Sequence, residues 1–131
     1  MAHDPAPAAD APLLPGATPV QETARLTASI TPTAAPNFIY ATYFCTAASD
    51  LAATKALTVM RRGGAQIGNP TFVYSASGQI FGTNGGSVMD APGSTSALTY
   101  TVGIASNVGG NNVHGCIASG GGSMTLEEIQ G

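Results

Sequence analysis

The stretch Ser87–Ile129, SVMDAPGSTSALTYTVGIASNVGGNNVHGCIASGGGSMTLEEI, decides the fold class of this 131-residue chain. In its middle, the segment LTYTVGI at 98–104 alternates large apolar residues with threonine and glycine. Because successive side chains of a strand point to opposite faces, one face of this segment is apolar and the other is small and polar. Turn-forming residues precede it at 90–93, and loops rich in glycine and asparagine follow at 107–112 and 120–122. The stretch therefore predicts strands joined by turns.

Similar alternation upstream extends the prediction to the whole chain after residue 19. The predicted strands lie at 20–30, 37–45, 55–62, 71–77, 79–81, 87–89, 98–104, 113–118 and 123–129, with a short edge piece at 65–68. Asn69-Pro70 and Asn84-Gly85-Gly86 are predicted as turns, and 46–54 as a loop or a single helical turn. Counted with their turns, these segments indicate an all-β fold, a single jelly-roll-type β-sandwich of about eight strands.

The most aromatic predicted strand is NFIYATYFC at 37–45. Its alternate positions place aromatic residues on one face and mostly apolar residues on the other, so both faces are expected to be covered. The first face holds Phe38, Tyr40 and Phe44, and the second holds Ile39, Ala41, Tyr43 and Cys45. One face would meet the core and the other a neighbouring subunit. The alternative is a platform on which sugars or bases stack.

The N-terminal segment 1–19 has a different composition from the rest of the chain. It contains five prolines and many alanines and lacks strand or helix periodicity, which is typical of an extended arm with polyproline character. We therefore divide the chain into an arm at 1–19 and a β-sandwich domain at 20–131. Leu13 and Leu14 are the only large apolar pair in the arm and are the expected anchors on a neighbouring protein. A flexible linker is the alternative.

Composition and charge exclude several classes of function. Only 8% of the residues are charged, against roughly 25% in an average soluble domain, and the net charge is −3. Nucleic-acid binding requires a basic patch, which four basic residues do not supply. We expect no membrane span and no secretory signal peptide. Without a signal peptide, Cys45 and Cys116 are expected to be buried free thiols, although a disulfide between two sheets is possible.

No catalytic or metal-binding pattern stands out. His114 and Cys116 share one face of a strand but lack further ligands or a third catalytic partner, so we expect neither a metal nor a cofactor. Glu127 and Glu128 are adjacent and therefore point to opposite faces, which argues against a glycosidase carboxylate pair. A buried glutamate needs a partner, and the basic pair Arg61-Arg62 is the expected source, within or across subunits. We expect the protein not to be an enzyme.

The C-terminal third resembles a family of proteins from tailed bacteriophages. The residues that carry the resemblance are the turn Asp90-Ala91-Pro92-Gly93, the strand Leu98-Thr99-Tyr100-Thr101-Val102 and the terminal element Ser123-Met124-Thr125-Leu126-Glu127-Glu128-Ile129. They resemble the trimeric jelly-roll module, similar to the tumour-necrosis-factor and C1q head folds, that occurs at fibre tips and in capsid decoration proteins. The chain departs from the fibre proteins in having no shaft.

The resemblance implies a homotrimer that sits on a capsid, binds the major capsid protein through its N-terminal arm and stabilises the shell. Such a capsid decoration, or cement, protein would be made in the host cytoplasm and act on the virion surface. The expected oligomer interface comprises Phe38, Tyr40, Tyr43, Phe44, Tyr100 and Glu128. One alternative is a fibre or spike tip that binds a host-surface receptor or glycan. Another is a soluble module of non-viral source with the same fold.

Overall fold

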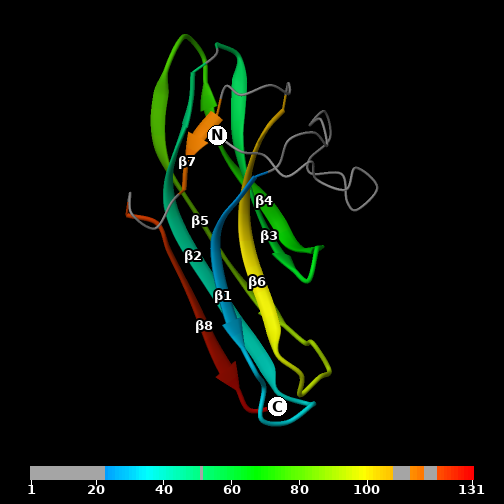
Figure 1. Ribbon diagram of the computed structural model, residues 1–131. Coiled ribbons are helices and arrows are strands. Elements are labelled where there is room, and N and C mark those ends of the chain that lie inside the picture. Colours follow the sequence, from blue (N-terminus) through cyan, green and yellow to red (C-terminus); the bar gives the residue numbers. More distant parts are fainter. Residues whose placement is uncertain (1–22, 51, 108–112, 117–120) are drawn as a thin grey trace.

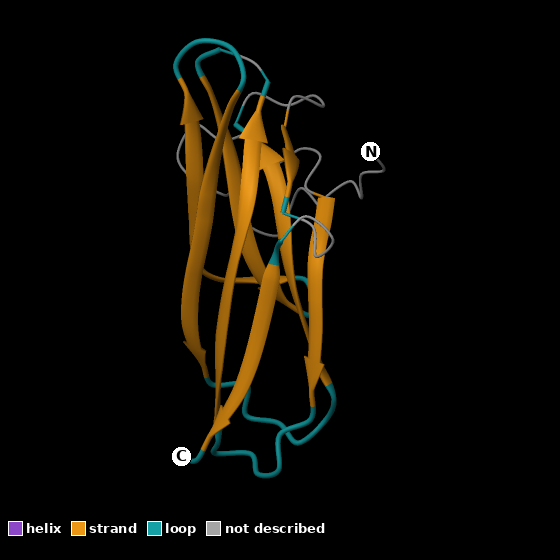
Figure 2. Ribbon diagram, turned by 90° about the vertical axis from the view of Figure 1, so that its left-hand side faces the viewer, coloured by secondary structure: helices purple, strands orange, loops and turns teal. Residues whose placement is uncertain are grey.

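The computed structural model describes residues 23–50, 52–107, 113–116 and 121–131, and every regular element within these ranges is a β-strand. The strands are β1 (Thr23–Ile30), β2 (Phe38–Ser49), β3 (Thr54–Arg62), β4 (Ala65–Ser75), β5 (Ile80–Asp90), β6 (Leu98–Ser106), β7 (Val113–Gly115) and β8 (Ser123–Ile129). They form two antiparallel sheets that pack face to face (Figures 1 and 2), so the predicted all-β sandwich is confirmed.

The first six strands follow a nested plan. β1 pairs with β6, β2 with β5, and β3 with β4, as in one long antiparallel hairpin folded over on itself. Rolling this hairpin brings β3 beside β6, which completes the sheet β1-β6-β3-β4. Nested pairs rolled into two sheets are the jelly-roll arrangement, here with three pairs where an eight-stranded form has four.

The remaining two strands extend the second sheet beyond β2. β7 pairs with the end of β2 at Ala47–Ser49, and β8 pairs with its beginning at Phe38–Phe44. The long strand β2 is therefore flanked by β5 on one side and by β7 and β8 on the other (Figure 1). β2 is also longer than predicted, because Thr46–Ser49 continues the ladder with β5 and is not a loop.

The core lies between the sheets and follows the predicted alternation. Ile39, Ala41 and Tyr43 of β2 face Tyr100 and Val102 of β6, and all five side chains are buried. Val20 to Glu22, assigned by sequence to the first strand, and the N-terminal arm lie outside the described residues.

The predicted turn at Asn84-Gly85-Gly86 is wrong, because these residues lie in the middle of β5. Asn84 is buried, and its Nδ2 donates hydrogen bonds to the Ala56 carbonyl and to Thr58 Oγ1, at 3.3 and 3.2 Å. Gly86 lies under the Tyr43 ring, where an added Cβ would come within 3.2 Å of Tyr43 Cε1. The glycine leaves room for the Tyr43 ring of β2, which local sequence cannot reveal.

Asn69-Pro70 is also not a turn, since β4 runs through it as a single edge strand. The β3–β4 register shifts between Thr58 and Met60, opposite this dipeptide. Proline donates no ladder hydrogen bond, so edge strands and bulges are the places where a sheet accepts it. Both conditions are met here, which explains how the turn-like sequence continues as a strand.

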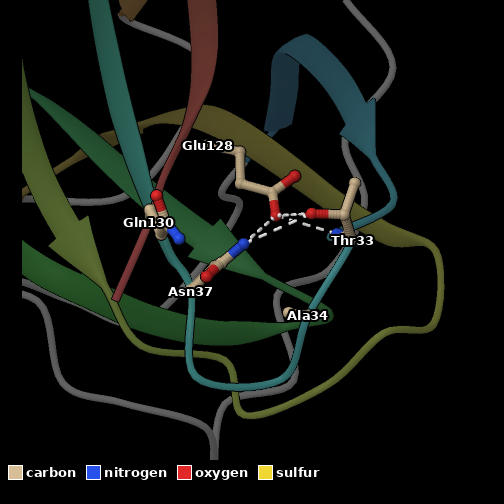
Figure 3. A pocket seen from close by; sticks show the side chains of 5 residues that line it. All are labelled: Thr33, Ala34, Asn37, Glu128 and Gln130. Atoms are coloured by element: carbon tan, nitrogen blue, oxygen red, sulfur yellow. Dashed lines mark hydrogen bonds between the residues drawn. The ribbon is translucent and has the colours of Figure 1, made fainter.

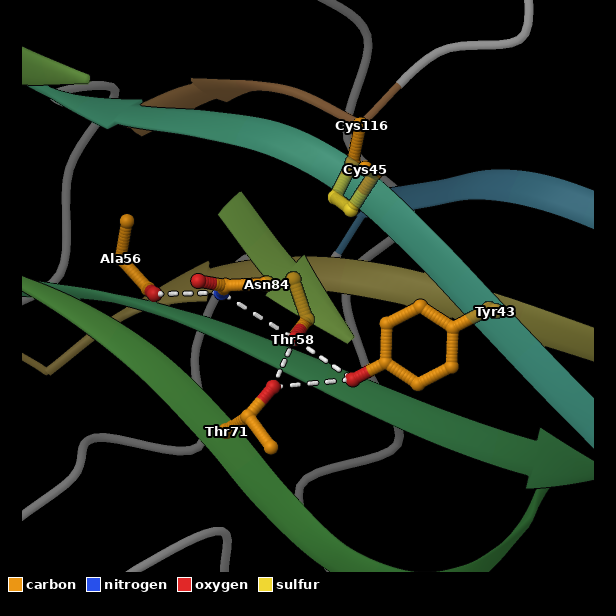
Figure 4. The surroundings of a disulfide bond; sticks show 7 residues. All are labelled: Tyr43, Cys45, Ala56, Thr58, Thr71, Asn84 and Cys116. Carbon is orange, nitrogen blue, oxygen red and sulfur yellow. Dashed lines mark hydrogen bonds between the residues drawn. A yellow bond between two sulfur atoms is a disulfide. The ribbon is translucent and has the colours of Figure 1, made fainter. Parts of the chain in front are cut away.

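The predicted free thiols are wrong as well, because Cys45 and Cys116 form a disulfide. Their Cα atoms are 4.7 Å apart, and both side chains are buried in the core. The bond does not bridge the two sheets. It joins β2 to the residue that follows β7, its neighbour in the same sheet (Figure 4).

Candidate functional site

The outer face of β2 carries the most prominent exposed apolar surface of the described residues. Five large side chains lie there on β2 and β5 and are 37 to 60% exposed: Phe38, Tyr40, Phe44, Phe81 and Met89. We call this set the aromatic face. Large apolar patches on soluble proteins mark surfaces that interact with other molecules.

The strand register shows how the aromatic face is assembled. Tyr40 of β2 lies between Met89 of β5 and Glu127 of β8. Phe44 lies between Gly85 and Ser123, two small residues that leave its ring projecting from the sheet. Of the described side chains that the register places on this face, Glu127 is the only carboxylate.

The far end of the aromatic face is formed by β5 and β7. The rings of Phe81 and His114 meet edge to face with centroids 5.9 Å apart, on either side of Ala48. Ala48 is buried beneath them although it points away from the core. His114 Nδ1 lies 3.2 Å from Asp50 Oδ2, and Gln79 Nε2 donates to Asp50 Oδ1 at 2.7 Å.

Phe38, Tyr40 and Phe44 lie on this surface as the sequence predicted, but two other expected interface residues do not. Tyr43 is 4% exposed and Tyr100 is fully buried. Both side chains point into the sandwich and are not accessible to another molecule. Each tyrosine hydroxyl has an internal hydrogen-bond partner, which allows the side chain to be buried.

Tyr43 satisfies its hydroxyl in a buried network between the sheets (Figure 4). Its oxygen lies 2.8 Å from Thr58 Oγ1 and 3.0 Å from Thr71 Oγ1, and the two threonine hydroxyls are 2.7 Å apart. Buried polar groups without such partners would destabilise the fold. The network therefore allows a tyrosine to cross the core between β2 and the β3–β4 pair.

Tyr100 binds a carboxylate at the opposite end of the core. Its hydroxyl donates to Asp90 Oδ2 at 2.6 Å, and Arg62 Nη1 lies 2.5 Å from the same oxygen. Burial, followed by the hydrogen bond to Asp90, raises the pKa of Tyr100 well above its usual value. Arg62 thus pairs with Asp90, and the predicted pairing of Arg62 with Glu127 or Glu128 is wrong. Asp90 is closer because it faces Arg62 across the sandwich.

Glu128 is held instead by the loop between β1 and β2 (Figure 3). Its Oε2 accepts hydrogen bonds from Thr33 N at 2.8 Å, Thr33 Oγ1 at 2.7 Å and Asn37 Nδ2 at 2.5 Å. These bonds, that from Asn37 most strongly, lower the pKa of Glu128. Ala34 and Gln130 complete a shallow pocket around the carboxylate. The arrangement attaches β8 to the rest of the sandwich.

Glu128 was predicted at the oligomer interface. Its register partner Ile39 faces the core, so the carboxylate lies at the rim of the inner face and not on the aromatic face. Asp90 flanks Ile39 on the other side. Two carboxylates with internal partners therefore close this end of the core.

Phe81 and Met89 were missed because the predicted turn divided β5. Read as one strand, the odd-numbered residues from Phe81 to Met89 share a face, and both ends of that face are apolar. Leu13 and Leu14, the predicted anchors of the arm, lie outside the described residues.

Two further findings concern the described ranges, and a third concerns the whole chain. In the described ranges, no group of three or more histidine, cysteine, aspartate or glutamate side chains is placed to hold a metal ion. No helix in those ranges has the length and hydropathy needed to span a membrane. In comparisons with known proteins, no family model, curated protein or solved structure matches this chain.

Proposed function

We propose that this protein is a structural subunit that assembles through its aromatic face, as a homotrimeric decoration protein on the outer surface of a viral capsid. The observation that carries the proposal is the aromatic face itself, which exposes five large side chains with one carboxylate, Glu127, along its strands and a second, Asp50, at its far end. A chain with 8% charged residues has few charges to cover its surface. Contact with other subunits would remove the exposed apolar surface from water.

The size of the aromatic face suits a protein interface. With each of its side chains about one-third to two-thirds exposed, the face presents on the order of 500 Å² of apolar surface. A standard interface covers about 800 Å² per partner, so these side chains would supply more than half of one. Aromatic residues and methionine are also the types enriched at the centres of interfaces.

The trimer and the capsid partner rest on the resemblance of the C-terminal third to phage jelly-roll modules. In that arrangement the N-terminal arm, with Leu13 and Leu14, contacts the major capsid protein. The work done is mechanical, because each trimer adds contact area between neighbouring capsid subunits. The virion surface would then be the site of action.

Two measurements test the proposal. Sedimentation of the full chain should give three times the subunit mass, and a Tyr40→Ser/Phe44→Ser variant should sediment as a folded monomer. Removing residues 1–19 should abolish co-sedimentation with capsids while leaving the trimer intact. A full chain that stays monomeric at all concentrations would overturn the proposal.

A second function, recognition of a host-surface glycan by a fibre or spike tip, is favoured by one specific cluster. Exposed Phe81 lies beside His114, with Asp50 and Gln79 adjacent, so a ring for stacking is next to hydrogen-bonding groups. Binding of the intact chain to a glycan array, lost in Phe81→Ala, would favour this function. Binding to capsids without glycan binding would favour the first.

A further inference from the structure

β7 is attached to the sandwich by a short pairing with β2, by the buried side chain of Val113 and by the disulfide. It has three residues, Val113 to Gly115, and β2 is its one strand partner among the described residues. Short strands with a single neighbour contribute few hydrogen bonds against the entropy cost of ordering the chain. The disulfide, directly after the strand, adds a covalent constraint that helps to keep β7 in place.

The constraint lies on the inner side of the sheet. Directly after β7, Cys116 N donates to the Thr46 carbonyl at 2.7 Å, and its sulfur is bonded to Cys45. Gly115 lies so close to β2 that an added Cβ would come within 2.3 Å of the Thr46 oxygen. Cys116 itself has a positive φ of 55°, an uncommon conformation for a residue with a side chain. The disulfide secures this tight approach.

The side of the β2–β7 pairing that faces away from the core is part of the aromatic face. His114 of β7 packs against Phe81, and together they cover Ala48. If β7 left β2, Phe81 would lose this neighbour and Ala48 would be exposed. The disulfide on the inner side therefore immediately follows the strand that forms the far end of the aromatic face.

We propose that oxidation of Cys45 and Cys116 completes the aromatic face, so that assembly competence is regulated by disulfide formation. This inference rests on the proposed function, because it concerns the same surface. Disulfides persist in oxidising environments and are rare in the cytosol. The reduced chain would lack the far end of the aromatic face, and the oxidised chain would present the face complete.

The chemistry is thiol–disulfide exchange with a soluble disulfide such as oxidised glutathione. One cysteine thiolate attacks the soluble disulfide, which forms a mixed disulfide and releases one thiolate. The second cysteine thiolate attacks the mixed disulfide, which forms the Cys45–Cys116 bond and releases the other. The two cysteines lose two protons and two electrons, and the soluble disulfide becomes two thiols. Both sulfurs are buried afterwards, which shields the bond from reduction.

The test compares the full chain with a Cys45→Ala/Cys116→Ala variant. We expect amide exchange at 113–115 to accelerate at least ~tenfold in the variant while the β2–β5 amides stay protected. The dissociation constant for self-association should rise by about tenfold or more. Equal exchange rates at 113–115, or equal self-association of the two proteins, would overturn the inference. Monomeric behaviour of the oxidised full chain would instead overturn the proposed function, since the exchange measurement remains valid on a monomer.

If the double variant does not fold, the wild-type chain supplies the same comparison. It is refolded with a phosphine reductant, which is then removed, and oxidised glutathione is added in steps. Self-association should increase in proportion to the fraction of chains whose mass has fallen by two hydrogens. Full association before any thiol is lost would overturn the inference.

Discussion

The inner and outer faces of β2 carry similar side chains but have different surroundings. On the inner face Ile39, Tyr43 and Cys45 are at most 4% exposed, whereas on the outer face Phe44 is 54% exposed. The inner residues have partners in their own subunit: a hydroxyl network and a disulfide. The outer residues pack against few side chains within the subunit. The contrast indicates that the inner face specifies the fold and that the outer face is free to contact other molecules, as the proposed function requires.

The largest expected difference in stability is between two tyrosine-to-alanine variants, one on each face of β2. Tyr43→Ala should lower the free energy of unfolding by about 4 kcal/mol, because it leaves a cavity and removes a partner from Thr58 and Thr71. Tyr40→Ala, three residues away on the outer face, should change it by less than about 1 kcal/mol. Urea unfolding at a concentration where the protein is monomeric measures both. Equal losses would break the distinction between the faces.

Removal of the Asp90 carboxylate, which lies beside Ile39 at one end of the core, should have the next largest effect. Asp90→Ala leaves Arg62 and the buried Tyr100 hydroxyl without their shared partner and should cost about 3 kcal/mol. Glu127→Ala, on the exposed outer face, is the matched control and should cost at most about 0.5 kcal/mol. Thermal unfolding of the two variants gives the comparison. An Asp90→Ala protein as stable as wild type would show that the Arg62–Asp90 pair does not hold the two sheets together.

A smaller effect is expected for Glu128 and depends on pH. Because its pKa in the folded protein lies below the usual 4.5, its hydrogen bonds stabilise the fold above that value and are lost as the pH falls through the folded value. In Glu128→Gln, the free energy of unfolding should therefore fall less than in wild type as the pH is lowered. Unfolding curves collected from pH 7 down to about 3 would reveal it. Parallel pH profiles of the variant and wild type would contradict this role.

The smallest effect on stability is expected on the outer face itself. Phe44→Ser should leave the unfolding free energy of the monomer within about 0.5 kcal/mol of wild type, since its ring is half-exposed. Self-association should nevertheless weaken, as measured by sedimentation equilibrium. Loss of monomer stability with unchanged association would reverse the roles assigned to the two faces.

Much of the fold could be predicted because the strands alternate strongly. The alternation in 98–104 and 37–45 placed β6 and β2 and separated their two faces. It did not show which face is inward, and the buried Tyr43 and Tyr100 were expected at an interface. Errors arose where a residue serves a distant neighbour. Gly86 accommodates Tyr43 from another strand, and the local sequence suggested a turn. Pro70 is accepted because β4 lies at an edge, which follows only from the strand order.

The candidate site could be predicted only in part for the same reason. Phe38, Tyr40 and Phe44 follow from alternation within one strand. The disulfide depends on the β2–β7 register, and the pairing of Arg62 with Asp90 depends on how the sheets face each other. These contacts join residues far apart in the chain, and periodicity contains no information about which strands become neighbours.

The position of β2 also has a consequence for how the chain folds. β2 pairs with β5 on one side, and on the other Phe38 pairs with Ile129. During synthesis, the most aromatic strand therefore emerges long before its second neighbour exists. Contacts between such distant segments slow folding, and apolar strands without partners promote aggregation in the meantime. The nascent chain is accordingly expected to depend on ribosome-associated chaperones until β8 has been made.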